Sequence, residues 1–236
     1  MKFTQEQKKL RRRLMEVIHQ SRTSHIGSAL SVIEIIDAIY QIKKKNDKFV
    51  LSNGHAAAAY YVILEKHKIL KDIDLNKLGV HPDRNEEIGI DVSTGSLGQG
   101  FPIALGMALA SPKKTVFCLM SDGESAEGSV WESLRVYQDQ FPKNLRIIIS
   151  ANGWGAYDRI SSKLLKNRFK GFGLKVNDFN GHDVEEIAET LGSEPVEPTL
   201  YFAKTTSEQL PFLKGLIAHY HTMSDNEYQL AIKKFS

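Results

Sequence analysis

The stretch Thr115-Val116-Phe117-Cys118-Leu119-Met120, followed by Ser121-Asp122-Gly123, decides the fold of this chain. A short and almost unbroken apolar run is typical of a strand that is buried on both faces, which is the pattern of a parallel sheet. The Asp-Gly pair marks the turn at which this strand ends. The same pattern recurs three times along the chain. The further expected strands are Leu145 to Ile149, Leu174 to Val176 and Thr199 to Ala203.

The order of elements around these runs predicts the fold class. From residue 98 onward the sequence indicates helix, strand, helix, strand, loop, strand, helix and strand. This alternation is typical of an α/β fold, here a doubly wound, mainly parallel sheet with helices on both faces. Residues 1–97 look helical and punctuated by glycine, and we expect them to cover one edge or face of the sheet. Because no repeat, low-complexity tract or Pro/Gly-rich linker interrupts the chain, we expect a single domain over residues 1–236.

Four expected helix starts carry a capping-box pattern. In this pattern a side-chain oxygen at the N-cap and an acid or amide three residues later satisfy free backbone N–H groups of the first turn. Apolar residues at helical spacing follow each pair. The four pairs are Thr4 with Gln7, Ser31 with Glu34, Asp183 with Glu186, and Ser224 with Glu227.

Composition excludes several classes of protein. The chain has 236 residues, of which 42% are hydrophobic, so it can bury a substantial core. Its net charge of +3 is small and its basic residues are spread, which does not favour a nucleic-acid partner. The longest apolar run, Ala56 to Leu64, is too short to span a membrane, and Met1 to Arg13 lacks an apolar signal segment. The single cysteine, Cys118, lies in an apolar run and fits a reducing, cytoplasmic setting.

Two expected strand ends carry side chains that suit a metal ion. Asp122 follows the first run, and Asn152 follows the second run 30 residues later, which is about the length of one βαβ unit. Both should emerge at the carboxyl edge of the sheet, where ligands of open parallel sheets bind. Their oxygens suit Mg²⁺, which commonly binds few protein ligands together with phosphates. Gly123 would let an anion approach the N–H groups of the next helix. The spacing therefore predicts a metal-bridged diphosphate, although Asp-Gly and Asn-Gly also occur in plain turns.

Seven segments, in order along the chain, resemble motifs of one enzyme family. They are Ser24 to Ser28, Phe49 to Ala56, Val80 to Pro82, Ser93 to Gly100, Ser121 to Glu132, Asn152, and Gly181 to Asp183. The Ser52-Asn53-Gly54-His55-Ala56 run and the Thr94-Gly95-Ser96-Leu97-Gly98-Gln99-Gly100 run are the most specific. Over roughly residues 10–205 the chain resembles the N-terminal, diphosphate-binding domain of transketolases. These are thiamine-diphosphate enzymes that transfer two-carbon ketol units.

The resemblance implies a site for thiamine diphosphate and Mg²⁺. Asp122, Asn152 and the backbone carbonyl of Trp154 would hold the metal ion. The diphosphate would be contacted by His55 and by the N–H group of Gly123. Mg²⁺ prefers oxygen ligands, and phosphate groups are commonly bound by backbone N–H groups.

Further residues are implied to contact the organic part of the cofactor. Gly95 would accept a hydrogen bond from the 4′-amino group of the aminopyrimidine, and Leu97 would wedge the cofactor into a bent form. In that form the amino group lies beside the thiazolium C2–H and can remove its proton. Ser96 and Glu124, in the same motifs, are expected to bind the cofactor as well.

Three residues are implied to take part in the reaction itself. His25 and His81 would line the substrate channel and handle hydroxyls and protons of the ketose. Glu127 resembles a family carboxylate at the interface between two active sites. Histidine suits this task because its pKa lies nearest the working pH. Alternatively, Glu124 and Glu127 could lie at the start of a helix and serve only to interact favourably with its dipole.

Each histidine also has a plainer interpretation. His25 before a helix could be a cap or surface residue, His55 at the head of an apolar helix a satisfied core residue, and His81 part of a loop. His182 is expected to be a turn residue without a part in the site. The surrounding motifs favour the functional interpretation for the first three.

The sequence departs from the family pattern at several positions. Ser121 occupies the position of the first glycine in the family's G-D-G motif. Ala151 occupies the position of the first asparagine in its N-N motif. Gly155 to Asp158 replaces a branched residue followed by Asp-Gly, and Ser207 to Pro211 replaces a Lys-Gly-Lys-Gly loop. The family's last active-site histidine is expected at His221. His219 competes for that position because the similarity is weak there.

These observations predict an N-terminal subunit of a split transketolase, which acts on sugar substrates. The family's pyrimidine-binding domain, with the glutamate that activates the cofactor, is not present before the chain ends at Ser236. We therefore expect a separate C-terminal pyrimidine-binding subunit and self-association in a two-plus-two heterotetramer, with no nucleic acid and no membrane. Two alternatives remain open: another thiamine-dependent acyloin or two-carbon transfer in a specialised sugar pathway, and a non-catalytic scaffold subunit.

Overall fold

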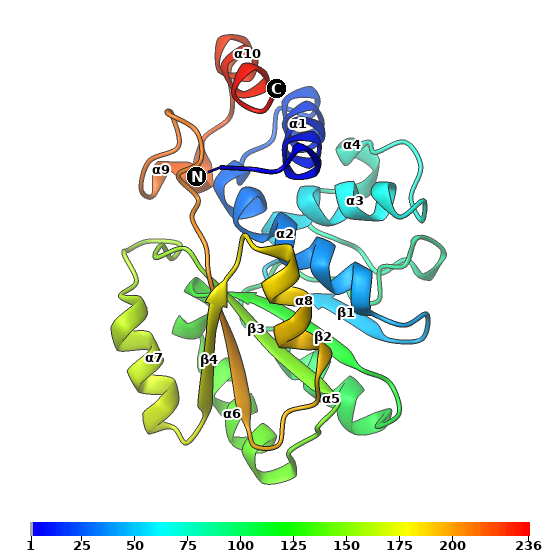
Figure 1. Cartoon of the computed structure of the whole chain (residues 1–236), viewed down its shortest axis with the longest axis vertical. Helices are drawn as coiled ribbons and strands as arrows, with labels where there is room; N and C mark the ends of the chain where they lie inside the picture. The colour runs from blue at the N-terminus through cyan, green and yellow to red at the C-terminus, as the bar shows by residue number, and fades with distance from the viewer. Residues whose placement is uncertain (1) are drawn as a thin grey trace.

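A five-stranded sheet forms the centre of the computed structural model, which describes residues 2–236 (Figure 1). The strands lie in the order β1-β2-β3-β5-β4, and each neighbouring pair is parallel. This confirms the expected α/β fold with a parallel sheet. The strands are β1 (Lys48–Leu51), β2 (Val116–Ser121), β3 (Leu145–Ala151), β4 (Lys175–Asn180) and β5 (Thr199–Lys204).

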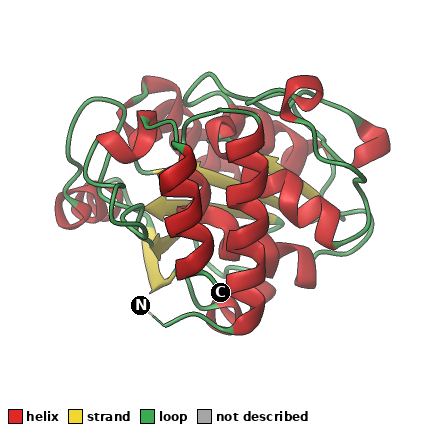
Figure 2. Ribbon diagram, turned by 90° about the horizontal axis from the view of Figure 1, so that it is seen from above, coloured by secondary structure: helices red, strands yellow, loops and turns green. Residues whose placement is uncertain are grey.

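Helices cover both faces of the sheet, as Figure 2 shows from above. On one side lie α2 (Ile26–Ile42), α3 (Ala57–Lys66) and α8 (Val184–Gly192), with α1 (Gln5–Gln20) packed on α2 and α3, and α10 (Asp225–Lys234) packed on α1. The other face carries α5 (Gly100–Ala110), α6 (Gly128–Gln140) and α7 (Ser162–Gly171). The short elements are α4 (Leu75–Leu78), α9 (Ile217–Tyr220), η1 (Gly54–Ala56), η2 (Glu86–Ile88) and η3 (Gly123–Ala126).

Strand β2 explains why the sheet separates two apolar cores. Successive side chains of a strand point to opposite faces. Phe117 and Leu119 therefore pack in the core under α2 and α3, whereas Cys118 and Met120 pack under α5 and α6. Cys118 is fully buried, and burial raises the pKa of its thiol well above the usual value, so it acts as a small apolar side chain.

The structure corrects three expectations about the elements. The N-terminal 97 residues contribute an edge strand, β1, as well as helices. The connection between β3 and β4 contains helix α7, where we expected only a loop. Strand β4 lies at the other edge of the sheet and is largely exposed, so it is not buried on both faces as expected.

Two of the four expected capping boxes are complete. Thr4 with Gln7 begins α1, and Ser224 with Glu227 begins α10. Asp183 caps α8, because its carboxylate accepts a hydrogen bond from the N–H of Glu186. The capping box is incomplete, since the Glu186 carboxylate accepts from the N–H of Asn180 and not from that of Asp183.

The expected helix start at Ser31 is wrong. Helix α2 begins five residues earlier, at Ile26, and Ser31 lies inside it, where its hydroxyl donates to the carbonyl of Gly27. The Glu34 carboxylate is fully buried and binds the guanidinium of Arg11 on α1. A buried charge requires such a partner, so this pair fixes α1 against α2.

The C-terminal segment returns across the top of the sheet to the N-terminal helix (Figure 1). Leu213, Ala218 and Met223 are buried in the same core as α2. Helix α10 packs beside α1, and Phe235 is fully buried next to Phe3 with their rings 5.9 Å apart. The segment after β5 is therefore fixed at several points.

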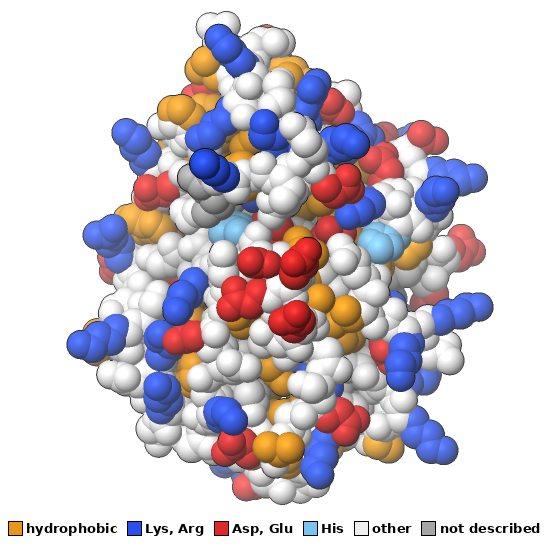
Figure 3. Space-filling view, in the orientation of Figure 1, with side chains coloured by type: hydrophobic (Ala, Val, Ile, Leu, Met, Phe, Trp, Pro, Cys, Tyr) orange, Lys and Arg blue, Asp and Glu red, His pale blue; other side chains and the backbone are white. Residues whose placement is uncertain are grey.

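The surface over α8 is strongly acidic, as Figure 3 shows near the centre of the view. Glu185 and Glu186 lie in the first turn of that helix, where acids complement the helix dipole. Among the described residues, no helix is both long and apolar enough to cross a membrane.

Candidate active site

A cavity of about 160 Å³ opens beside the carboxyl ends of β2 and β3. This is the edge at which parallel sheets bind ligands. Its walls come from segments that lie far apart in the sequence. It is lined by His25, His55, His81, Gly95, Leu97, Ser121, Gly123, Trp154, Gly155, Ala156, His219 and Tyr220.

Asp122 and the loop that carries Asn152 lie next to each other at this edge. Ser121 pairs with Ser150 in the ladder between β2 and β3, so the residues that follow them emerge side by side. The fully buried Asp122 carboxylate accepts from the N–H of Gly153 at 2.8 Å. The side-chain oxygen of Asn152 accepts from the N–H of Trp154 at 3.0 Å. These bonds fix the two side-chain oxygens, and the peptide that carries the Trp154 carbonyl is held by the N–H of Gly155, which donates to the carbonyl of Asp158 at 2.8 Å.

The Asp122 carboxylate is suited to binding a cation. Burial raises its pKa to about 7, although hydrogen bonds from Gly153 and Gly123 oppose that shift. An adjacent cation favours the ionised form of a carboxylate. Among the described residues, no three His, Cys, Asp or Glu side chains form a metal cluster by themselves. The donors fit Mg²⁺ instead, because it binds one or two protein carboxylates together with phosphate oxygens.

Three histidines from separate segments converge on the cavity. His25 precedes α2, His55 lies in η1, and His81 lies in the loop after α4. The ring of His25 lies 5.3 Å from that of His55 and 6.4 Å from that of His81. Gly95 makes room for this cluster, since a Cβ at that position would lie 2.7 Å from the His81 ring.

Two of these imidazoles are neutral over the physiological pH range. Burial lowers the pKa of His25 to about 4, helped by His81 and His219. Burial also lowers the pKa of His55 to about 3, with smaller contributions from His25, His219 and His81. A neutral imidazole has one donor and one acceptor nitrogen. The cluster can therefore form hydrogen bonds with hydroxyl groups, both as donor and as acceptor.

His219 has the place in the cavity wall that we expected for His221. The carbonyl of His219 accepts from the N–H of His25 at 2.9 Å, and its Nδ1 is buried without a hydrogen-bond partner among the described residues. Burial lowers the pKa of His219. His221 lies outside the cavity lining and contacts Glu227 at 3.0 Å. The two positions differ because α9 turns only His219 and Tyr220 toward the cavity.

The remaining expected residues divide into two groups. Gly95, Leu97, Gly123 and Trp154 line the cavity. Outside the lining lie Ser96, which is exposed, Glu127, which is half-buried, and Glu124, which is fully buried.

Glu124 connects the loops of the site instead of lining it. One carboxylate oxygen accepts from the Ser52 hydroxyl and from the N–H of Gly98. The other accepts from the N–H of Ser121 at 2.9 Å. These donors lie in the three motifs that carry His55, Leu97 and Asp122, and the carboxylate therefore fixes their relative positions. Burial raises the pKa of Glu124, opposed by these hydrogen bonds.

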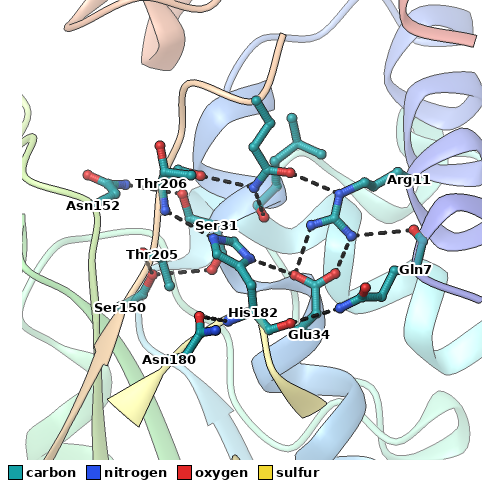
Figure 4. Close-up of polar contacts among 12 residues, drawn as sticks. Gln7, Arg11, Ser31, Glu34, Ser150, Asn152, Asn180, His182, Thr205 and Thr206 are labelled. Carbon is teal, nitrogen blue, oxygen red and sulfur yellow. Dashed lines mark hydrogen bonds and ion pairs between the residues drawn. The ribbon is translucent and has the colours of Figure 1, made fainter. Parts of the chain in front are cut away.

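His182 belongs to a buried polar network behind the site (Figure 4). Its Nδ1 lies 2.9 Å from the Glu34 carboxylate, and its Nε2 accepts from the N–H of Thr206 at 3.1 Å. Arg11 binds both Glu34 and the side chain of Gln209. The network thus fixes the segment that replaces the Lys-Gly-Lys-Gly loop. No local pattern indicates it, because its members lie up to 198 residues apart.

Tyr220 and Ala156 were not expected in the cavity wall. Tyr220 lies beyond the segments with recognisable motifs, and Ala156 has no functional group. Only the fold brings them together, through a hydrogen bond from the Tyr220 hydroxyl to the Ala156 carbonyl at 2.8 Å.

Comparisons with known proteins agree with this geometry. Residues 4–209 match the family described as transketolase, thiamine diphosphate binding domain. The chain is 30% identical to an apulose-4-phosphate transketolase subunit of Phocaeicola vulgatus, over 98% of this chain and 92% of that protein. It is 32% identical to the 6-deoxy-6-sulfo-D-fructose transketolase subunit SqwG of Clostridium sp., over 77% of this chain and 75% of that protein.

A solved structure extends the comparison to a longer transketolase. The transketolase of Campylobacter jejuni superposes on the whole chain with a TM-score of 0.81 at 26% identity. The chain covers 43% of that protein. The chain therefore belongs to the transketolase family, as an N-terminal thiamine diphosphate-binding subunit of the split kind, and its reaction is the transfer of a ketol unit.

Proposed function

We propose that this chain is the diphosphate-binding subunit of a Mg²⁺-dependent split transketolase, which acts together with a pyrimidine-binding subunit. The observation that carries the proposal is the contact between the Asp122 carboxylate and the loop of Asn152, beside a cavity lined by three expected histidines. Thiamine diphosphate, when bound, supplies the nucleophilic carbon that takes up the two-carbon unit. A single-domain organisation over residues 1–236 and a cytoplasmic setting remain part of the proposal.

In this proposal Asp122, Asn152 and the Trp154 carbonyl hold Mg²⁺ on the diphosphate. Gly123 keeps the cradle open, since a Cβ there would approach Gly155 to 3.2 Å. Its N–H donates to the Asp122 carboxylate at 3.1 Å in this structure and would contact the diphosphate when the cofactor binds. Asp122 supplies the only carboxylate of this set, so it carries most of the electrostatic attraction. The buried position of that carboxylate strengthens the attraction because the local dielectric constant is low.

The histidines would bind the sugar and transfer its protons. His25 and His81 face the cavity and would contact ketose hydroxyls, and His55 would contact the diphosphate. We add His219 to this set in place of His221, because its buried Nδ1 has no hydrogen-bond partner within the described chain. General acid–base catalysis by positioned side chains of this kind typically contributes about 10²–10⁴-fold to the rate.

The partner subunit is needed for the other half of the cofactor site. Gly95 and Leu97 would contact one side of the aminopyrimidine, and the relatives named as subunits imply a second chain. Helix α5 supports self-association, because Ile103 and Leu109 are 40% and 41% exposed there. An exposed apolar face of this kind favours a protein partner. A two-plus-two heterotetramer with twofold symmetry is the simplest assembly.

The substrate class follows from the relatives and from the charge of the cavity. The names of the two split relatives contain a sugar phosphate and a sulfonated sugar. We propose that this chain likewise serves a sugar with an anionic group at its far end. Within residues 2–236, no Lys or Arg lines the cavity, so this chain would bind the uncharged hydroxyl end. The partner would then bind the anionic end.

A ketol-transfer assay tests the proposal. The purified chain, the pyrimidine-binding subunit and their mixture are supplied with thiamine diphosphate, Mg²⁺, a phosphorylated or sulfonated ketose and an aldehyde acceptor. We expect transfer only from the mixture. Full activity of the isolated chain would contradict the split arrangement, and a mixture that binds thiamine diphosphate without transfer would favour a scaffold.

A further inference from the structure

The loop over residues 153–160 depends on contacts from another part of the chain. It carries the Trp154 carbonyl, and it departs from the family pattern at Gly155 to Asp158. Inside the loop, the N–H of Gly155 donates to the carbonyl of Asp158 at 2.8 Å. Tyr157 is 89% exposed, so the outer side of the loop has little packing of its own. Such loops open easily because few buried contacts hold them.

The C-terminal segment contacts this loop at two points. The Tyr220 hydroxyl donates to the Ala156 carbonyl at 2.8 Å. Gly215 lies against the Trp154 ring, and a Cβ at Gly215 would approach two ring carbons to 3.1 Å. The Arg159 guanidinium lies 5.0 Å from the centroid of the Trp154 ring. The indole therefore contacts both its own loop and the C-terminal segment.

The segment that makes these contacts is anchored in the core by three of its side chains. Leu213, Ala218 and Met223 are at most 2% exposed and pack in the core with α2. The N–H of Gly215 donates to the Glu208 carboxylate at 2.9 Å. Residues 210–236 lie beyond the part of the chain that matches the family description. An element that is anchored in the core and contacts a poorly packed loop restricts the conformations of that loop.

We infer that Tyr220 and Gly215 are positioning residues, which hold the 153–160 loop in the geometry that binds the cofactor. The inference rests on the proposed cofactor site, because the Trp154 carbonyl and Asn152 are its metal-binding groups. Tyr220 acts by restraining the Ala156 peptide, and Gly215 by leaving room for the Trp154 ring. The altered loop of this chain is thus stabilised by a C-terminal segment that lies outside the family match.

Tyr220→Phe tests the inference, because it removes only the hydroxyl. Tyr157→Phe is the matched control, since Tyr157 lies in the same loop but is almost fully exposed. Hydrogen exchange of the full chain without ligand reports on the loop directly. We expect Tyr220→Phe to speed exchange within residues 150–163 by about 2- to 10-fold, the range for loss of one neutral hydrogen bond. Tyr157→Phe should leave exchange unchanged.

Calorimetry with thiamine diphosphate and Mg²⁺ then measures the consequence for binding, with the pyrimidine-binding subunit present. We expect Tyr220→Phe to weaken the affinity by about 2- to 10-fold. Gly215→Ala should also shift the Trp154 fluorescence, measured in a Trp131→Phe background so that Trp154 is the single tryptophan. An affinity equal to that of the wild type in Tyr220→Phe overturns the inference. If the wild type does not bind the cofactor, the proposed function fails, while the exchange comparison still decides whether Tyr220 restrains the loop.

Discussion

The Glu124 carboxylate accepts a hydrogen bond from the backbone N–H of Gly98 at 3.0 Å, across 26 residues of sequence. The same carboxylate binds Ser52 and Ser121. Three loops of the cofactor site are thus joined at one buried group. A buried carboxylate stabilises such an arrangement only while all its donors remain paired.

Glu124→Gln should therefore destabilise the fold. The new amide group cannot accept at both positions, so at least one buried N–H group loses its partner. The expected loss in the free energy of unfolding is about 1–3 kcal/mol. Urea denaturation measures it, with Glu132→Gln on the exposed side of α6 as the control. Equal stability of wild type and Glu124→Gln would show that the carboxylate does not join the loops.

Asp122→Ala should remove Mg²⁺-dependent binding of thiamine diphosphate. The affinity should fall by more than about 100-fold, because outer-shell partners alone contribute up to that much. Asn152→Ala should act in the same direction but less strongly, since it removes a neutral ligand. Asp158→Ala is the control, because that side chain is exposed in the same loop. Unchanged affinity of Asp122→Ala in calorimetry would contradict the metal assignment.

His25 and His81 should affect turnover more than cofactor binding. We expect His25→Asn and His81→Asn to lower kcat by about 10²–10⁴-fold while the cofactor affinity stays within a few-fold. Asparagine is chosen because His25 has a φ of 67°, a left-handed conformation that asparagine tolerates better than most residues. His55→Asn should instead weaken cofactor binding. Steady-state kinetics of the two-subunit enzyme would refute these roles if all three variants matched the wild type.

Stability should fall as the pH falls below about 6.5. The pKa of His55 is about 3 in the folded chain, whereas an unfolded histidine has a pKa of about 6.5. Between these values the unfolded state binds a proton that the folded state does not bind. Each such histidine therefore lowers the free energy of unfolding by about 1.4 kcal/mol for each pH unit of acidification.

Urea denaturation of the wild type and of His55→Asn, at several values between about pH 7 and pH 4, measures this contribution. The pH dependence of the variant should be less steep by about the same 1.4 kcal/mol per pH unit. Parallel curves for the two proteins would mean that His55 is not held neutral by burial.

Helix α5 should mediate self-association. Ile103 and Leu109 are both exposed on this helix, and Leu109 also lines a groove of about 530 Å³ between α5 and α6. Replacing both with Gln should shift the chain toward a smaller species in analytical ultracentrifugation, since it removes apolar area from the interface. Leu230→Gln on α10, which is 55% exposed, is the matched control. An unchanged sedimentation coefficient for the α5 variant would place the interface elsewhere.

Sequence patterns predicted the centre of the sheet better than its edges. Strands β2, β3 and β5 are buried on both faces, so they appear as continuous apolar runs. Strand β1 has only four residues and begins with Lys48, and the exposed β4 has a mixed pattern. The short strand β1 was therefore missed, whereas the run Leu174 to Val176 indicated β4 but neither its length nor its exposure. The helix start predicted from Ser31 and Glu34 was wrong for another reason. Glu34 does not cap a helix but binds Arg11 on a different helix.

The candidate site was predictable where residues lie in motifs and not where the fold alone brings them together. Asp122 and Asn152 follow strands at βαβ spacing, and the structure places their loops in contact. His219 and His221 are two residues apart, and only the turn of α9 decides which faces the cavity. Tyr220 depends on the path of the C-terminal segment, which no local pattern describes.

The neutrality of the cavity has a consequence for how the cofactor would be retained in the cell. Its described lining contains no Lys or Arg, and the pKa values of His25 and His55 keep both rings uncharged. Without a metal ion, the negative charges of the diphosphate and of the ionised form of Asp122 would repel each other, by about 1 kcal/mol for each close pair even in water. Ionic strength changes such short-range contacts little. The concentration of free magnesium, and not that of salt, would therefore set the fraction of the enzyme that carries the cofactor. A chelator should remove the cofactor, whereas raising the ionic strength without a chelator should leave the holoenzyme intact.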